Sequence, residues 1–310
     1  MLTSQVLCQT MWSDQKRRSD QKPWFAVSML IAVFVLGGCA ARVPYEYDSA
    51  ERIEFRYSLP GQYDVVRIEL SDKNSQAQYA AYLPTESKGQ HPLVIWQNGT
   101  GVDIETYDAI ARHLATWGIV VLGSYDKQMA SGQSAIASLR HVERWTADRR
   151  HPLYQRIDQS RVAMAGSSQG AVGAINAHTR FRKGRSIRTL AIHGTPTAQA
   201  IKFFGLDFDY DASTVSVPIF IMTGTEDEFI SPIAWNEAIF DSLKGSALRV
   251  MGVSTDADHI EFADDAGRMR GYLTAWLTFQ LLGDAVAAKA FIGPAEITTN
   301  PDWTPVRIKN

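Results

Sequence analysis

Cysteine is scarce in this chain. Only two of its 310 residues are cysteines, Cys8 and Cys39, and both lie ahead of the stretch expected to fold. The domain from about residue 60 onward therefore cannot contain a disulfide, and it has no cysteine cluster to bind a metal ion. We expect its chemistry to need neither a metal nor an organic cofactor.

An excess of positive charge is also lacking. The sequence has 31 Lys and Arg against 33 Asp and Glu, which gives a formal net charge of -2, and no basic stripe. This balance argues against nucleic acid as a partner. Hydrophobic residues make up 45% of the chain, which is enough for the core of one α/β domain of ordinary size.

No hydrophobic run in the N-terminal region has the length of a confident membrane span. The apolar run at residues 24–36 follows basic residues and has the length of a signal-peptide core. It ends in Leu-Gly-Gly-Cys at residues 36–39, which resembles a bacterial lipobox. Residues 1–38 are therefore predicted to be a lipoprotein signal peptide, with lipid added to Cys39. The alternative is an ordinary secretory signal in which Cys39 is accidental.

Lipid on Cys39 would attach the protein to a membrane, and residues 39–59 are interpreted as the tether to the folded domain. They are polar and aromatic without a clear period. Ala40 follows the cysteine, where Asp retains many enteric lipoproteins at the inner membrane. By this resemblance we expect an outer-membrane lipoprotein of the bacterial cell envelope.

The most informative stretch is Gly-Ser-Ser-Gln-Gly at residues 166–170. A short apolar run at residues 162–165 precedes it and predicts a buried strand, and an Ala-rich run at residues 171–178 predicts a helix. A strand, a tight G-x-S-x-G turn and a helix in this order form a nucleophile elbow. The pattern predicts Ser168 as a nucleophile, although a bare Gly/Ser loop can show the same five letters.

Strands alternate with helices along the rest of the chain. The pattern predicts α/β architecture with a mostly parallel sheet covered on both faces, and an antiparallel hairpin at its start. We expect one domain over residues 60–310, in which a C-terminal extension from about residue 283 wraps the surface. The predicted strands are residues 64–70, 78–83, 92–96, 119–122, 162–165, 189–192, 217–222 and 248–253, and the predicted helices are residues 104–117, 131–148, 171–178, 233–243 and 263–282.

A serine nucleophile of this kind needs an acid and a histidine later in the chain. The loop after the predicted strand 217–222 offers Asp227, with Glu226 as its rival. A carboxylate there would hold an imidazole in one tautomer and stabilise its charged form. The other possibility is a solvated acidic turn.

His259 is the predicted base because it follows the next strand, at the sheet edge where α/β proteins place their sites. His193 ends an earlier strand, so it could line the pocket instead. His178 ends the elbow helix. The remaining histidines are predicted to lie on the surface: His91, His113, His141 and His151.

Two backbone N–H groups should stabilise an oxyanion. One belongs to Gln169, directly after the nucleophile. The other is expected in the Gly-rich turn at residues 97–101, where Thr100 is the favoured donor. A plain strand-to-helix turn would have the same composition.

These segments together resemble a known family. The Trp-Gln-Asn-Gly-Thr-Gly turn at residues 96–101, the elbow, the acid loop at 217–232 and Ala-Asp-His at 257–259 are similar to those of α/β-hydrolases. The resemblance is to the branch that contains dienelactone hydrolases, chlorophyllases and cutinase-like polyesterases. It implies the α/β-hydrolase fold, with Ser168, Asp227 and His259 as the catalytic triad and Thr100 and Gln169 as oxyanion donors.

The expected activity is the hydrolysis of a small-molecule or lipid-like carboxylic ester through an acyl-enzyme. An amidase or acyltransferase could use the same triad, and an envelope binding protein could keep the fold without catalysis.

Overall fold

The described part of the chain is organised around a nine-stranded sheet. The computed structural model describes residues 52–72, 75–85 and 89–310, and the strands lie in the order β1-β2-β4-β3-β5-β6-β7-β8-β9. The strands are β1 (Val65–Ser71), β2 (Gln78–Pro84), β3 (His91–Gln97), β4 (Val120–Ser124), β5 (Ile157–Ser167), β6 (Thr189–His193), β7 (Ile219–Gly224), β8 (Arg249–Ser254) and β9 (Trp303–Lys309).

The six strands from β3 to β8 are parallel, and antiparallel strands extend the sheet at both edges. β1 pairs with β2 from Val65 opposite Pro84 to Ser71 opposite Gln78, which confirms the predicted hairpin. β2 continues antiparallel onto β4, and β9 runs antiparallel to β8. The predicted α/β class with a mostly parallel sheet is therefore confirmed.

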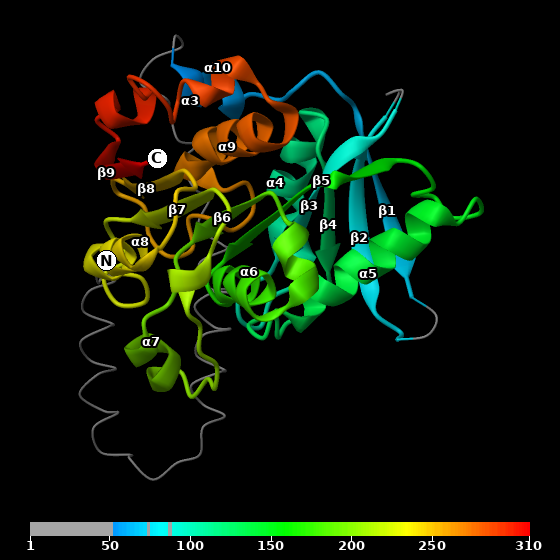
Figure 1. Ribbon diagram of the computed structural model, residues 1–310, viewed down its shortest axis with the longest axis horizontal. Coiled ribbons are helices and arrows are strands. Elements are labelled where there is room, and N and C mark those ends of the chain that lie inside the picture. The colour runs from blue at the N-terminus through cyan, green and yellow to red at the C-terminus, as the bar shows by residue number, and fades with distance from the viewer. Residues whose placement is uncertain (1–51, 73–74, 86–88) are drawn as a thin grey trace, which may run out of the picture.

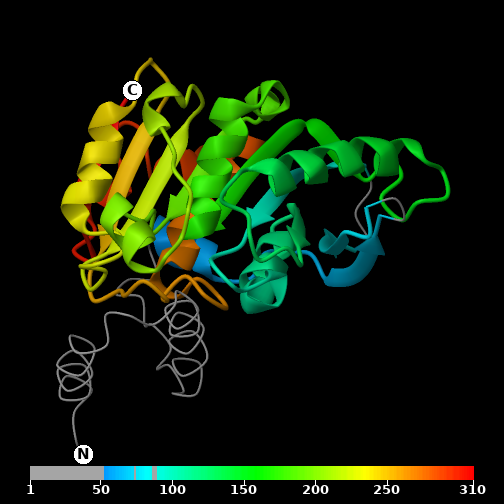
Figure 2. The same ribbon diagram turned by 90° about the horizontal axis from the view of Figure 1, so that it is seen from below.

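Helices cover both faces of the sheet, as Figures 1 and 2 show. Within β3, Val94 and Trp96 belong to one core and Leu93 and Ile95 to the other, because side chains alternate along a strand. The first core contains residues of α3 (Ile53–Ser58), α4 (Asp108–Thr116), α9 (Arg270–Leu282) and α10 (Ala285–Ala288). The second contains residues of α5 (Gln133–Ala147), α6 (Gln169–Arg180) and α8 (Ile233–Ser242).

Shorter elements connect these layers. They are α7 (Ala198–Phe203) and the 3₁₀ turns η1 (Ile104–Tyr107), η2 (Arg182–Ser186), η3 (Ala212–Thr214), η4 (Gly267–Met269) and η5 (Glu296–Thr299). No helix was predicted where α7 lies. α9 begins at Arg270 instead of residue 263, because the positive φ angles of Asp264, Ala266 and Gly267 interrupt the chain just before it.

The ends of the domain differ from the sequence prediction. Residues 53–58, assigned to the tether, form α3, and the fully buried Tyr57 joins the core there. Figure 1 shows α3 beside α9, far away in the sequence. The predicted surface extension after residue 283 instead supplies β9 and the buried Phe291 and Trp303. The ends of the domain thus close one core together.

A buried carboxylate joins these two ends. Glu54 of α3 is 1% exposed, and its two oxygens accept hydrogen bonds from Asn300 Nδ2 and Trp303 Nε1, both at 2.6 Å. Burial raises the pKa of Glu54 to about 7, since the two hydrogen bonds offset only part of the desolvation penalty.

We expect this carboxyl group to make folding stability depend on pH. Its folded pKa of about 7 exceeds the ordinary value of 4.5 for a Glu side chain, so the folded state holds the proton more tightly than the unfolded state. The contribution is therefore fully present below pH 4.5 and disappears as pH rises through 7. It amounts to roughly 3 kcal/mol by the usual conversion. Urea unfolding of wild type and Glu54→Gln at pH 4.5 and at pH 7 checks this. The free energy of unfolding should fall more in wild type than in Glu54→Gln over this range, and an equal fall in both proteins would contradict the prediction.

None of the helices in the described part of the chain is both long and apolar enough to cross a membrane. The predicted signal peptide and Cys39 fall within residues 1–51, which lie outside the described residues.

Candidate active site

The predicted elbow has the expected geometry around Ser168. β5 ends at Ser167 and α6 begins at Gln169, so Ser168 alone makes the turn, with φ 56° and ψ -122°. A positive φ is uncommon outside glycine and marks local strain. A Cβ on Gly166 would lie 2.7 Å from Gly170 O, and one on Gly170 would lie 2.0 Å from Gln97 O. Both flanking positions therefore require glycine.

The structure brings the predicted acid and base together. Asp227 lies in the loop after β7 and His259 in the loop after β8, and Asp227 Oδ2 is 2.6 Å from His259 Nδ1. The other oxygen of Asp227 accepts a hydrogen bond from the amide of Ser231 at 3.0 Å. Glu226, the rival acid, is exposed. The geometry thus selects Asp227 as the partner of His259.

Asp227 is suited to remain ionised. It is 3% exposed, and burial alone would raise its pKa. The charge of His259 and the hydrogen bond to it outweigh burial, so the pKa of Asp227 lies below its usual value. The carboxylate therefore fixes the imidazole so that the other ring nitrogen, Nε2, is free for chemistry.

Ser168 and His259 line one pocket together with Thr100. Within the described residues no hydrogen bond yet joins Ser168 Oγ to the imidazole. In a free enzyme such a contact is often long, and it tightens when substrate binds. The common pocket is what the predicted roles require.

Thr100 lines this pocket, and Gln169 directly follows Ser168. Gln169 is the first residue of α6, so its N–H has no acceptor inside the helix and can point at a ligand. Its side chain contacts the opposite turn, since Nε2 donates to Thr100 Oγ1 at 3.3 Å and Oε1 accepts from the amide of Met129 at 2.7 Å. The first hydrogen bond joins the elbow to the turn after β3, and the second joins it to the loop between β4 and α5.

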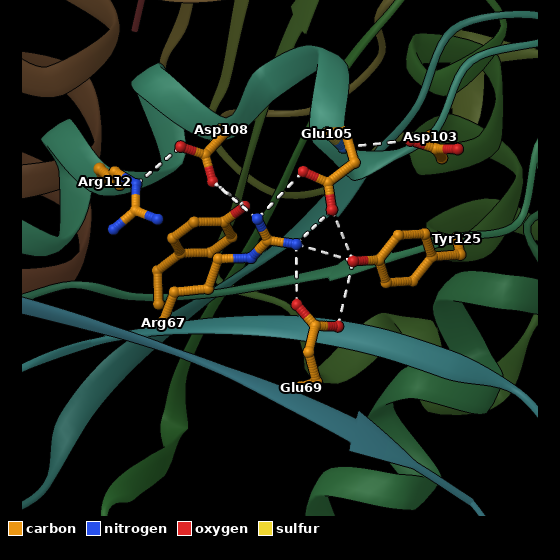
Figure 3. A network of polar contacts seen from close by, with 8 residues as sticks. Arg67, Glu69, Asp103, Glu105, Asp108, Arg112 and Tyr125 are labelled. Carbon is orange, nitrogen blue, oxygen red and sulfur yellow. Dashed lines mark hydrogen bonds and ion pairs between the residues drawn. The ribbon is translucent and has the colours of Figure 1, made fainter.

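A polar network fastens the segment that follows this turn. Figure 3 shows the guanidinium of Arg67, on β1, among the carboxylates of Glu69, Glu105 and Asp108. Arg67 also donates to the hydroxyl of Tyr125 at 2.7 Å. Glu105 belongs to η1 and Asp108 to α4, so the hairpin strand is tied to both helical segments. The pairs are partly exposed, and each contributes at most about 1 kcal/mol.

A buried chain of polar contacts links the elbow to the turn after β3. His193 Nδ1 lies 3.0 Å from Ser167 Oγ, and Ser167 also bonds the hydroxyl of Tyr107. The Tyr107 hydroxyl accepts a hydrogen bond from the amide of Gly99 at 3.0 Å. The chain therefore joins the residue before Ser168 to the residue before Thr100. Tyr107 has no local sequence signal, because its contact exists only after β3, β5 and η1 have packed.

His193 does not line the pocket, contrary to the possibility considered from its sequence position. Its ring is fully buried and stacks on Phe262 with a centroid distance of 4.6 Å. Burial and the nearby charge of His259 lower the pKa of His193 to about 3, so it is neutral. A neutral ring 6.0 Å from His259 does not compete with it for a proton.

Removing the Tyr107 hydroxyl tests the role of this buried chain. Tyr107→Phe would leave the Gly99 N–H and the Ser167 hydroxyl short of a partner, which should destabilise the protein by about 1–3 kcal/mol. The looser turn should also lower kcat more than it raises KM. Urea unfolding and ester kinetics measure both effects, with Tyr154→Phe as the control. Wild-type stability and kcat in Tyr107→Phe would contradict the prediction.

Two of the histidines predicted for the surface are buried. His91 is 7% exposed and its Nδ1 lies 2.8 Å from Gly118 O, while His141 is 5% exposed and packs edge-on against Tyr79 and Trp145. Neither of them lines the pocket at Ser168. No group of three or more His, Cys, Asp or Glu side chains among the described residues could hold a metal ion.

Comparison with known proteins extends these observations. No curated protein matches the chain. A scan of protein families matches residues 40–302 to the PET hydrolase-like family (PETase). The matched stretch contains the elbow, the acid loop, the histidine loop and the turn after β3, on the sheet described above. The chain therefore belongs to the PET hydrolase-like family, in the polyesterase and cutinase-like branch of the α/β-hydrolases.

Proposed function

We propose that this protein is a serine hydrolase that cleaves carboxylic esters through an acyl-enzyme. The observation that carries the proposal is the Asp227–His259 contact of 2.6 Å at a pocket that also contains the strained Ser168. Membership of an ester-hydrolase family supports a small-molecule ester as the substrate.

The residues suggest the following reaction. Ser168 Oγ attacks the carbonyl carbon of the ester while His259 Nε2 takes the hydroxyl proton. The N–H groups of Gln169 and Thr100 stabilise the oxyanion of the tetrahedral intermediate. The intermediate collapses, the C–O bond to the alcohol breaks, and the leaving oxygen takes the proton from His259. Water then attacks the acyl-enzyme in the same way, which releases the carboxylic acid and restores Ser168.

The direct test is labelling with a fluorophosphonate probe, followed by hydrolysis of p-nitrophenyl acetate. We expect the probe to label wild type on Ser168 and to block ester turnover. A folded protein that takes up no label, beside a control esterase that does, would favour a non-catalytic binding protein. Labelling without ester turnover would favour an amidase or acyltransferase.

We propose separately that Cys39 is lipidated and holds the domain at the outer membrane. The support is the signal-like residues 24–36 and the Leu-Gly-Gly-Cys run at 36–39. Two acyl chains and a third on the new amino terminus anchor stably, whereas one chain binds only reversibly.

Replacing Cys39 with serine should release the protein from the membrane fraction without changing its turnover of a soluble ester. Fractionation and labelling with a fatty-acid analogue measure the first effect, and p-nitrophenyl acetate hydrolysis measures the second. Soluble, unlabelled wild type would show that the segment is an ordinary secretory signal. Folded but inactive Cys39→Ser would show that the anchor and the chemistry are linked.

A further inference from the structure

The pocket at Ser168 is apolar apart from the residues assigned to chemistry. Beyond Thr100, Ser168 and His259, its walls are Pro196, Ala200, Ile201, Phe204, Leu206, Phe208 and Ile230. Six of these seven side chains belong to residues 196–208, which include α7. We call residues 197–210 the cap segment, because Thr197 and Tyr210 make the polar contacts at its two ends. Figure 1 shows α7 at the lower left, apart from the helices that cover the sheet.

The space inside this pocket is small. Its cavity volume is about 20 Å³, and a cavity of roughly 10–15 Å³ already holds one water. On the other side of the cap segment lies a groove of about 280 Å³ between it and α8, lined mainly by apolar side chains together with Asp209, Asp211 and Ser242. Ile201 and Phe208 line both spaces, so they form the wall that separates the pocket from the groove.

Polar contacts fix the two ends of the cap segment. The amide of Thr197 donates to Ile230 O at 2.9 Å. At the other end, the Tyr210 hydroxyl donates to Pro196 O at 2.9 Å and accepts from Trp235 Nε1 at 2.7 Å. Between these ends, residues 198–208 make hydrogen bonds only within the cap segment, as far as the described residues go. Apolar side-chain packing therefore determines where the wall lies.

We propose that this pocket binds the acyl part of the ester, and that Ile201 and Phe208 limit it to short acyl chains. The inference rests on the proposed function. In the acyl-enzyme the acyl group stays attached to Ser168, which lines the pocket, whereas the alcohol must leave to solvent. A pocket closed at its inner end suits the group that stays. Its apolar walls favour an aliphatic chain and offer no polar partner for a charged one.

The wall makes a specific prediction about chain length. Wild type should hydrolyse p-nitrophenyl acetate and butyrate, and its kcat/KM should fall by at least about tenfold on octanoate, because a well-filled apolar pocket discriminates by about 10–200-fold per methylene. Phe208→Ala should open the pocket into the groove and raise the octanoate-to-acetate ratio of kcat/KM by about tenfold or more. Ile201→Ala should act in the same direction and gives an independent check if one variant folds poorly.

Phe203→Ala is the matched control. Phe203 also belongs to α7 and is aromatic, but it is 53% exposed and lines neither space. Its chain-length profile should equal that of wild type. A second series, acetate esters of alcohols of increasing length, should respond equally in wild type and Phe208→Ala.

The outcomes separate this inference from the proposed function. Folded wild type that hydrolyses no acetate or butyrate ester would overturn the proposed function. Ester turnover with the same acyl profile in wild type, Phe208→Ala and Ile201→Ala would overturn the acyl wall alone. A shift of the alcohol series instead of the acyl series would assign the pocket to the leaving group and would also overturn the inference.

Discussion

Ser168→Ala is expected to lower kcat for ester hydrolysis by on the order of a million-fold, the loss typical of removing a serine nucleophile. Alanine lacks the hydroxyl that forms the acyl-enzyme in the proposed reaction, so only positioning and oxyanion stabilisation remain. The fold should persist, because the substitution removes one oxygen atom from a turn defined by Gly166 and Gly170. Ester kinetics and urea unfolding of the same preparation measure both expectations.

Ser167→Ala is the matched control for this experiment. Its hydroxyl bonds His193, and Ser167 does not line the pocket, so the loss of this hydroxyl should weaken stability and reduce turnover far less than Ser168→Ala does. Wild-type turnover in Ser168→Ala would show that Ser168 is not the nucleophile. Loss of all activity in Ser167→Ala alone would show the same.

The second large effect is expected at the base and its carboxylate. His259→Ala should lower kcat by several orders of magnitude, and Asp227→Asn by up to about ten-thousand-fold, because the amide favours the wrong tautomer of the imidazole. In the proposed triad Ser168, His259 and Asp227 act as a unit, so Ser168→Ala combined with His259→Ala should be hardly slower than either single variant. Kinetics of the two single variants and the double variant measure this.

His151→Ala is the control here, since its ring stacks on Trp145 at 4.9 Å and lies away from the pocket lining. It should keep wild-type turnover. Losses that add up in the Ser168→Ala/His259→Ala double variant would mean that His259 serves another function.

The sequence by itself determined the elbow and the positions of β1 to β8 along the chain. The G-x-S-x-G turn is local, because the flanking glycines, the apolar strand and the Ala-rich helix lie within a few residues of Ser168. Asp227 and His259 were also predictable, since each follows a strongly apolar strand and parallel strands bring their carboxyl ends to one edge. The 2.6 Å contact between Asp227 and His259 arises because the loops after β7 and β8 lie side by side at that edge.

Only the tertiary structure decided what depends on contacts between distant segments. α3 and β9 lack strong periodic patterns of their own, and they form because Glu54, Asn300 and Trp303 meet across the two ends of the chain. The depth of the pocket is likewise invisible in the sequence. It follows from where apolar packing places Ile201 and Phe208, between the pocket at Ser168 and the groove along α8. Spacing along the chain carries no information about that position.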